Sequence, residues 1–258
     1  MKRFLLATVA LAALSAPAAA ADLATKYPVK AVAVVPVFSW TGFYIGGNFG
    51  YGGDKFTFDE VNTYYGDYYS SESRSVNSSG FFVGGQIGYN YQFANNVVLG
   101  IETDLQWSNI EGKYSESYAD YYGYVSNYNA GASVDYFGTI RARLGYAFDR
   151  FLPYITGGAA YGKTGLDINS SYYGDGYGAW GASSSSTKWG WTVGAGVEYA
   201  ITNNWTFKTE YLYVDLGSTD YSYYGTYCCS GYTNYNDIYS GSVDTKFHTL
   251  KAGVNYKF

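Results

Sequence analysis

The clearest pattern in the chain is a strict alternation of apolar and polar residues near Phe258. From Leu250 to Phe258 every second residue is apolar or aromatic, whereas polar or small residues, among them Lys251 and Lys257, fall between them. A period of two places successive side chains on opposite faces of a β-strand. The stretch Lys246–Phe258 therefore predicts a strand with one apolar and one polar face.

The same alternation recurs along the chain and predicts seven further strands. They are Thr41–Gly52, Gly80–Phe93, Val97–Ile110, Ser133–Phe148, Phe151–Lys163, Thr187–Tyr199 and Trp205–Leu216. Tight turns are predicted at residues 94–96, 149–150 and 201–204. The polar tracts 53–79, 111–132, 165–186 and 217–243 lack the alternation and are predicted to be long loops. A glycine recurs near the end of every second strand, which indicates a repeated hairpin: Gly88, Gly145, Gly196 and Gly253.

The two faces of these strands differ in charge. The apolar faces carry almost none, whereas the opposite faces carry Glu102, Asp104, Arg141, Arg143, Glu198, Lys208, Glu210, Lys251 and Lys257. Each strand exceeds the roughly 9–11 tilted residues that cross a bilayer, and strands can cross lipid only as a closed barrel. The pattern predicts an all-β fold, an eight-stranded antiparallel up-and-down transmembrane β-barrel with long outer loops and short periplasmic turns.

Side chains are expected to fill the interior of such a narrow barrel. Buried ions cost several kcal/mol each unless they are paired. Glu102 and Asp104 are therefore expected to contact Arg141 and Arg143 on the neighbouring strand, within an interior polar network.

The N-terminal residues have the composition of a secretory signal peptide. A short basic region, an apolar core and an Ala-rich end predict a signal peptide at 1–21, a periplasmic leader or linker at 22–39 and the barrel at 40–258. Removing the signal peptide leaves 14 basic and 21 acidic residues, a net charge of 14 − 21 = −7. This acidic balance argues against nucleic acid as a partner.

Residues with obvious chemistry are few, and neither a metal nor a cofactor is expected. Cys228 and Cys229 are adjacent, about 3.8 Å apart at Cα, too close for an unstrained disulfide. His248 is the only histidine; it is expected to face lipid near the loops as an interface aromatic, with a haem or metal ligand as the alternative. A Ser–His–Asp set is not expected, so the chain is predicted not to be an enzyme, although a carboxylate-only enzyme stays open.

The predicted loops are rich in tyrosine and acids. They hold 20 of the 33 tyrosines, with twelve acidic and three basic residues. Tyrosine among Ser, Gly and Asn is typical of recognition surfaces, since it offers contact area at low entropic cost. The candidate surface contacts are Tyr64, Tyr65, Tyr121, Tyr122, Tyr223 and Tyr224. The alternative is a soluble, variable coat without a defined ligand.

Several motifs together resemble a known family. The signal peptide, the proline-containing leader, the Trp-Thr-Gly-Phe-Tyr-Ile-Gly-Gly motif at 40–47 and the Tyr-Lys-Phe motif at 256–258 resemble the small alphaproteobacterial outer-membrane β-barrel proteins. This is the porin-family, opacity-protein-like group that includes the RopB-type proteins. The resemblance implies a bacterial outer-membrane location, contact with outer-membrane lipid and lipopolysaccharide, and recognition of Tyr256 and Phe258 by the barrel assembly machinery.

The resemblance also implies a role in envelope integrity and in contact with a host or the environment, and some relatives bind haem. We therefore expect a non-enzymatic integral outer-membrane barrel that contributes to envelope integrity and presents tyrosine-rich acidic loops. The alternatives are a surface adhesin or ligand-binding protein, with haem as one ligand, and a narrow channel.

Overall fold

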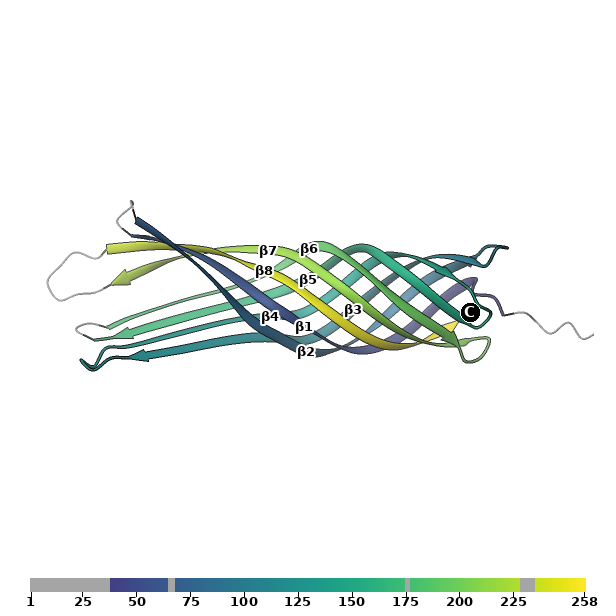
Figure 1. Cartoon of the computed structure of the whole chain (residues 1–258), viewed down its shortest axis with the longest axis horizontal. Coiled ribbons are helices and arrows are strands. Elements are labelled where there is room, and N and C mark those ends of the chain that lie inside the picture. Colours follow the sequence, from purple (N-terminus) through teal and green to yellow (C-terminus); the bar gives the residue numbers. More distant parts are fainter. Residues whose placement is uncertain (1–37, 65–67, 175–176, 228–234) are drawn as a thin grey trace, which may run out of the picture. The chain divides into compact units, whose positions relative to one another are not determined.

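The computed structural model describes residues 38–64, 68–174, 177–227 and 235–258. The described residues form eight strands: β1 (Gly42–Tyr64), β2 (Tyr68–Gln92), β3 (Val97–Ala119), β4 (Val125–Tyr146), β5 (Phe151–Tyr173), β6 (Tyr177–Ala200), β7 (Trp205–Tyr227) and β8 (Tyr235–Lys257). Each strand pairs antiparallel with the next, and β8 pairs with β1 to close the barrel (Figure 1). The predicted eight-stranded up-and-down barrel is confirmed.

The two ends of the barrel differ in their connections. At one end, here called the turn end, short turns at residues 93–96, 147–150 and 201–204 join the strands. Asn96 and Asp149 have φ values of 66° and 53°, a left-handed conformation that Asn and Asp tolerate better than most residues. At the opposite end, the loop end, β1, β3, β5 and β7 stop at Tyr64, Ala119, Tyr173 and Tyr227.

An apolar belt surrounds the half of the barrel nearest the turn end. On β1 it runs from Phe43 to Tyr51, and both of these outward side chains are exposed. Exposed aromatic residues also mark both borders, such as Trp107 and Trp189 toward the loop end and Trp205 toward the turn end. Nine residues of tilted strand are enough to cross a bilayer, and flanking aromatic girdles are typical of outer-membrane barrels. The belt is therefore the lipid-facing surface. None of the described residues forms a helix long and apolar enough to cross a membrane.

The boundaries of the predicted long loops are wrong. Most of residues 53–79, 111–132, 165–186 and 217–243 extend the strands beyond the belt. Outside the bilayer the outward face meets water. There the outward side chains are polar and the inward side chains are apolar. On β1, Phe56 and Phe58 point inward and are buried, whereas Lys55 is exposed.

The extended strands divide the loop half of the barrel into two sheets. Pairing of β2 with β3 reaches only Ser79↔Glu111, and pairing of β6 with β7 reaches only Trp191↔Asp215. The other neighbours stay paired toward the loop end. The first sheet is therefore β7-β8-β1-β2 and the second sheet is β3-β4-β5-β6, and Figure 1 shows the two groups diverging.

The interior is filled in three layers along the barrel axis. Along β3, Val98, then Glu102 and Asp104, then Ile110 point inward and are buried. The turn-end layer is apolar and consists of Phe38, Trp40, Val98, Ala147, Leu152, Tyr154 and Ala200. The loop-end core is apolar and consists of Phe56, Phe58, Val76, Phe82, Ile110, Ala130, Ala132, Val134, Phe137, Ala160, Leu166, Ile168, Leu212, Val214, Leu216, Tyr221, Val243 and Phe247. The charged side chains lie between these two layers.

Candidate functional site

The candidate site is the charged layer inside the barrel, called here the polar network. Its eight charged residues are Glu102, Asp104, Arg141, Arg143, Glu198, Lys208, Glu210 and Lys251, and each is almost completely buried. They come from β3, β4, β6, β7 and β8, at alternate positions of each strand, so the pleat directs them all inward. Strand register places Glu102 opposite Arg141 and Glu210 opposite Lys251.

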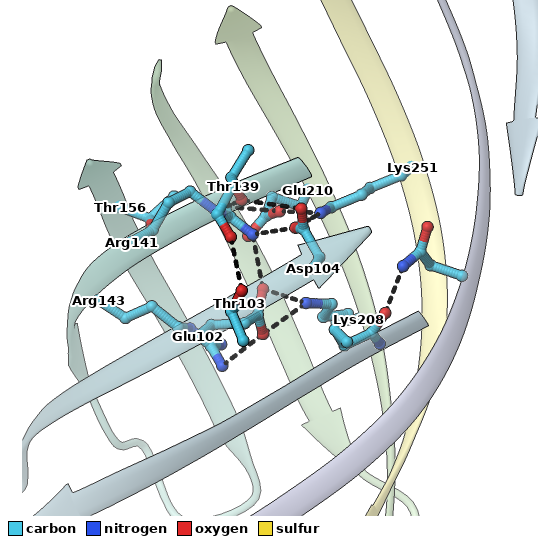
Figure 2. A network of polar contacts seen from close by, with 12 residues as sticks. Glu102, Thr103, Asp104, Thr139, Arg141, Arg143, Thr156, Lys208, Glu210 and Lys251 are labelled. Carbon is cyan, nitrogen blue, oxygen red and sulfur yellow. Dashed lines mark hydrogen bonds and ion pairs between the residues drawn. The ribbon is translucent and has the colours of Figure 1, made fainter. Parts of the chain in front are cut away.

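Glu102 lies at the centre of this network (Figure 2). One of its oxygens accepts a hydrogen bond from Arg141 Nη2 at 2.6 Å. Lys208 Nζ donates to both carboxylate oxygens, at 2.8 and 2.7 Å. Tyr44 OH adds a further bond at 2.8 Å, and Arg143 Nη1 lies 3.4 Å away. This carboxylate therefore joins residues from four strands.

Asp104 and Glu210 share the same cations. Arg141 Nη2 lies 2.9 Å from Asp104, and its Nη1 lies 2.9 Å from Glu210. Lys251 Nζ bridges the two carboxylates at 2.8 and 2.9 Å. Tyr154 OH donates to the other oxygen of Glu210 at 2.8 Å. These contacts connect strands on opposite sides of the barrel through the lumen.

Glu198 and Arg143 complete the charged layer. Arg143 Nη2 donates to Glu198 at 2.7 Å, and its guanidinium carbon lies 3.9 Å from the ring centroid of Tyr154 and 5.7 Å from that of Tyr44. Asn255 Nδ2 also donates to Glu198, at 2.8 Å. The eight charged residues balance as four carboxylates and four cations, which satisfies the condition that buried ions be paired.

Glu102, Asp104 and Glu210 also offer oxygens within 4.8 Å of one another, a spacing that could hold a metal ion. Hard cations prefer such carboxylate ligands. However, Arg141 contacts all three carboxylates at 2.6–2.9 Å. The guanidinium therefore occupies the position that a metal would take, and the donor set does not fit one. No other metal-compatible group of His, Cys, Asp and Glu occurs in the described part of the chain.

Sequence reasoning missed the tyrosines that bind the network. Tyr44 and Tyr154 point inward from β1 and β5, and both hydroxyls donate to network carboxylates. Two of the repeated glycines make room for them: a Cβ on Gly88 would lie 2.3 Å from Tyr44 Oη, and one on Gly196 would lie 2.6 Å from Tyr154 Oη. The inward position of Tyr44 on β1, read together with the glycine repeat, is the signal that could have identified it.

Lys257 was expected inside the network, and this prediction is wrong. Its ammonium donates to Ser39 O and lies 4.5 Å from the ring centroid of Phe38. Lys257 lies only two positions beyond the buried Asn255 on β8. This position lies at the mouth of the barrel, where Phe38 and Trp40 close the turn end.

His248 lies on the outside of β8, at the loop-end border of the apolar belt. Its Nδ1 lies 2.5 Å from Tyr211 OH, and its Nε2 lies 3.4 Å from an Asp54 oxygen. The side chain is 45% exposed. These contacts link β7, β8 and β1 across the seam where the barrel closes.

The candidate surface tyrosines are only partly described. Tyr121 and Tyr122 occupy the tip between β3 and β4 and are 98% and 84% exposed. The tip is ordered by Asp120, whose Oδ1 accepts hydrogen bonds from the backbone of Tyr122 and Tyr124 at 2.9 Å. Outside the described residues or side chains lie Tyr64, Tyr65, Tyr223, Tyr224, Cys228, Cys229, the predicted signal peptide and the predicted leader up to residue 37.

Tyr256 and Phe258, the predicted assembly signal, lie on the outer surface at the turn end. Their rings are 5.2 Å apart, and the backbone N–H of Phe258 donates to Phe43 O at 3.0 Å. Phe258 is 73% exposed. Both side chains therefore belong to the aromatic border of the apolar belt.

A family profile and known proteins resemble this chain over most of its length. The profile of the family described as outer membrane protein beta-barrel domain matches residues 6–258. The chain is 43% identical to the 31 kDa outer-membrane immunogenic protein of Brucella melitensis biotype 1, over the full length of both. It is 33% identical to the 22 kDa outer membrane protein of Rhizobium leguminosarum bv. viciae, covering 91% of this chain and 83% of the relative. The crystal structure of OprG from Pseudomonas aeruginosa is 15% identical, with a TM-score of 0.49, covering 86% of this chain and 98% of OprG.

Proposed function

The chain belongs to the outer membrane protein β-barrel family, and on that premise we propose that it is a closed, non-enzymatic barrel that reinforces the outer membrane. The observation that supports this proposal is the interior. A charge-balanced polar network fills the lumen between two apolar layers. A barrel filled in this way has no continuous aqueous path for solutes.

The same observation opposes a channel function. A passing ion would have to separate Arg141 or Lys208 from Glu102, and breaking a buried pair costs about 3–5 kcal/mol. It would also have to cross the loop-end core, in which Phe56, Phe137 and Phe247 are at most 1% exposed. The interior acts as a cross-link between strands.

The exterior supports contact with the two environments of an outer-membrane protein. In this family the turn end faces the periplasm and the loop end faces outward. The aromatic border near Tyr256 and Phe258 is the surface that the assembly machinery would recognise, and the border near Trp107 and Trp189 would meet lipopolysaccharide.

A surface-contact role is the second candidate. It is favoured by the exposed pair Tyr121 and Tyr122, which projects from an ordered tip. Exposed aromatic residues on a rigid turn are efficient contact residues, since little conformational entropy is lost on binding. This role concerns a host or environmental ligand and is compatible with a closed barrel.

The test is a deletion strain complemented with the wild type or with the tip variant Tyr121→Ala/Tyr122→Ala. Deletion is expected to sensitise the cells to detergent, and both forms are expected to restore resistance. Loss of surface attachment in the tip variant alone would identify the contact role. Unchanged detergent resistance in the deletion strain, together with lost uptake of small solutes, would overturn the proposal in favour of a channel.

A further inference from the structure

The separation of the two sheets creates strand edges in the loop half of the barrel. Within the described residues, four segments lack a neighbouring strand on one side: 68–78 of β2, 112–119 of β3, 177–190 of β6 and 216–227 of β7. An unpaired edge presents backbone N–H and C=O groups that can pair with another chain. Proteins usually protect such edges with charges, bulges or covering side chains.

The edges of β2 and β3 are protected by side chains. Arg74 on β2 reaches across to β3, where its Nη1 lies 3.9 Å from Glu116. Its guanidinium also lies over the rings of Tyr114 and Tyr128, at 5.7 and 5.1 Å from their centroids. These contacts tie the two sheets together along this seam.

The edge of β7 is protected by its geometry. The register with β8 shifts between Asp215 and Ser218, and Gly217 there has a φ of 74°. Asp215 Oδ1 accepts the Gly217 N–H at 2.8 Å and fixes the bulge. A bulge bends a strand and interrupts pairing, and Asp220 adds an exposed charge.

Among the side chains that the structure describes, none gives residues 177–187 of the β6 edge any of these protections. The segment Tyr177–Thr187 contains no charged residue and no proline. Ser183, Ser184 and Ser185 are exposed in succession, so both faces of the strand meet solvent around Ser184. On its other side this segment is fully paired with β5. The backbone is therefore already extended and ordered, which lowers the entropic cost of adding a strand.

Polar groups beside this edge also lack partners. Ser186 Oγ is buried without a hydrogen bond. Lys188 makes no ion pair with any side chain in the described part of the chain. Buried polar groups without partners are costly, so a ligand that satisfied them would gain free energy.

We propose that residues 177–187 of β6 form a docking strand for an extended segment of another protein, which adds antiparallel to the second sheet. The inward side chains of that segment would be apolar, because they would lie beside Ala182, which packs against the loop-end core. Its outward side chains would be polar, and at the end of its inward row an acidic side chain would pair with Lys188. The proposal rests on the outward orientation of the loop end given above.

A second copy of this chain fits the edge less well. Two copies in one membrane point the same way, so their β6 strands would run in parallel. Parallel pairing is slightly less stable than antiparallel pairing. A segment of a separate protein can run antiparallel to β6, and its backbone bonds would supply affinity while its alternate side chains supply specificity.

The experiment uses the full chain in detergent micelles and a labelled peptide of sequence Glu-Thr-Val-Thr-Val-Thr-Val-Thr-Val as the probe. In the antiparallel orientation its glutamate lies opposite Lys188. Fluorescence anisotropy measures binding, and hydrogen–deuterium exchange locates it. The control peptide has the same composition without the alternation.

Two matched variants place paired lysines on outward positions. Ser183→Lys/Ser185→Lys lies on the open edge, whereas Asn129→Lys/Asn169→Lys lies on the paired strands β4 and β5. We expect the peptide to slow exchange at 180–187, and the edge variant to bind at least about tenfold more weakly than the wild type. The control variant is expected to bind like the wild type.

Three results would overturn the proposal: no protection of 180–187 in the wild type, equal binding by the edge variant, or protection without peptide in a dimer of the chain. Hydrogen–deuterium exchange of the wild type with the peptide tests the proposal even if the edge variant fails to assemble. Neither readout depends on envelope integrity, so failure here is separate from failure of the proposed function.

Discussion

Replacing Glu102 with glutamine tests the energetics of the buried network. The carboxylate contacts Arg141 and Lys208 at 2.6–2.8 Å and lies 3.4 Å from Arg143. An amide has no charge, so Glu102→Gln leaves one uncompensated cation in the interior. Removing one partner of a buried ion pair costs about 3–5 kcal/mol. For a domain of 150–250 residues each kcal/mol shifts the midpoint by about 2–4 °C, which predicts a fall of roughly 6–20 °C.

The assay is the temperature at which the folded band converts to the unfolded band on unboiled gels. Glu111→Gln is the matched control, because Glu111 pairs with Lys113 at 3.0 Å but both side chains are more than half exposed. Exposed pairs contribute about 0–1 kcal/mol, so this variant should unfold near the wild-type temperature. Combining Glu102→Gln with Lys208→Gln restores charge balance and should cost less than Glu102→Gln alone.

Unfolding of Glu102→Gln within about 4 °C of the wild type would contradict this prediction. That result would mean that water solvates the remaining cations, and the lumen would not be enclosed as described. A charge-balanced double variant less stable than Glu102→Gln would also contradict it, because the pairing of charges would then not be the source of the stability.

Three further predictions concern packing and assembly. Trp40→Ala empties a site that is 1% exposed at the turn end and should cost about 3–5 kcal/mol in the same unfolding assay; no shift would contradict the role of the turn-end layer. Gly88→Val should reduce the assembled protein in outer-membrane fractions, because a Cβ there would lie 2.3 Å from a tyrosine hydroxyl, whereas at the outward Gly85 the nearest atom is 3.5 Å away. Equal levels of Gly88→Val and Gly85→Val would refute this. Removing Phe258 should impair insertion more than Tyr121→Ala does, as measured by surface labelling, and normal labelling would count against an assembly signal.

The lipid-facing half of the fold could be predicted because two constraints act on the same residues. The bilayer requires apolar side chains outside, and the narrow lumen requires charges to balance inside. Glu102 and Arg141 therefore stand out as inward charges on adjacent strands, and they are register partners. Lys257 fits the same alternation but lies outside the network. Alternation predicts the face on which a side chain lies, and it does not predict where along the barrel axis the lumen is closed.

The loop half was harder to predict because lipid no longer constrains it. Phe56 and Phe58 still alternate with polar residues, but the apolar face now points inward. In β4 the inward positions change from odd, as at Arg141, to even, as at Val134, across the irregularity at Asp135. A single extra residue reverses the assignment of faces. One period of two therefore does not fit the whole strand, although the strand continues.

Residues from distant strands meet in ways that single-strand patterns do not reveal. Glu198 is the register partner of Lys208, yet its ion pair is with Arg143, and Lys208 pairs with Glu102. Long side chains cross the lumen, so their partners depend on their position along the barrel axis and on the space available there. The division into two sheets likewise depends on where two pairings stop, at Ser79↔Glu111 and Trp191↔Asp215.

Single-channel recording of the purified protein in planar bilayers measures whether the barrel is sealed by its own side chains. Folded wild-type barrel, verified by its band on unboiled gels, should produce no conductance steps above the lipid baseline across the accessible voltage range. Stable nanosiemens openings from the folded protein would show instead that the lumen is an open pore.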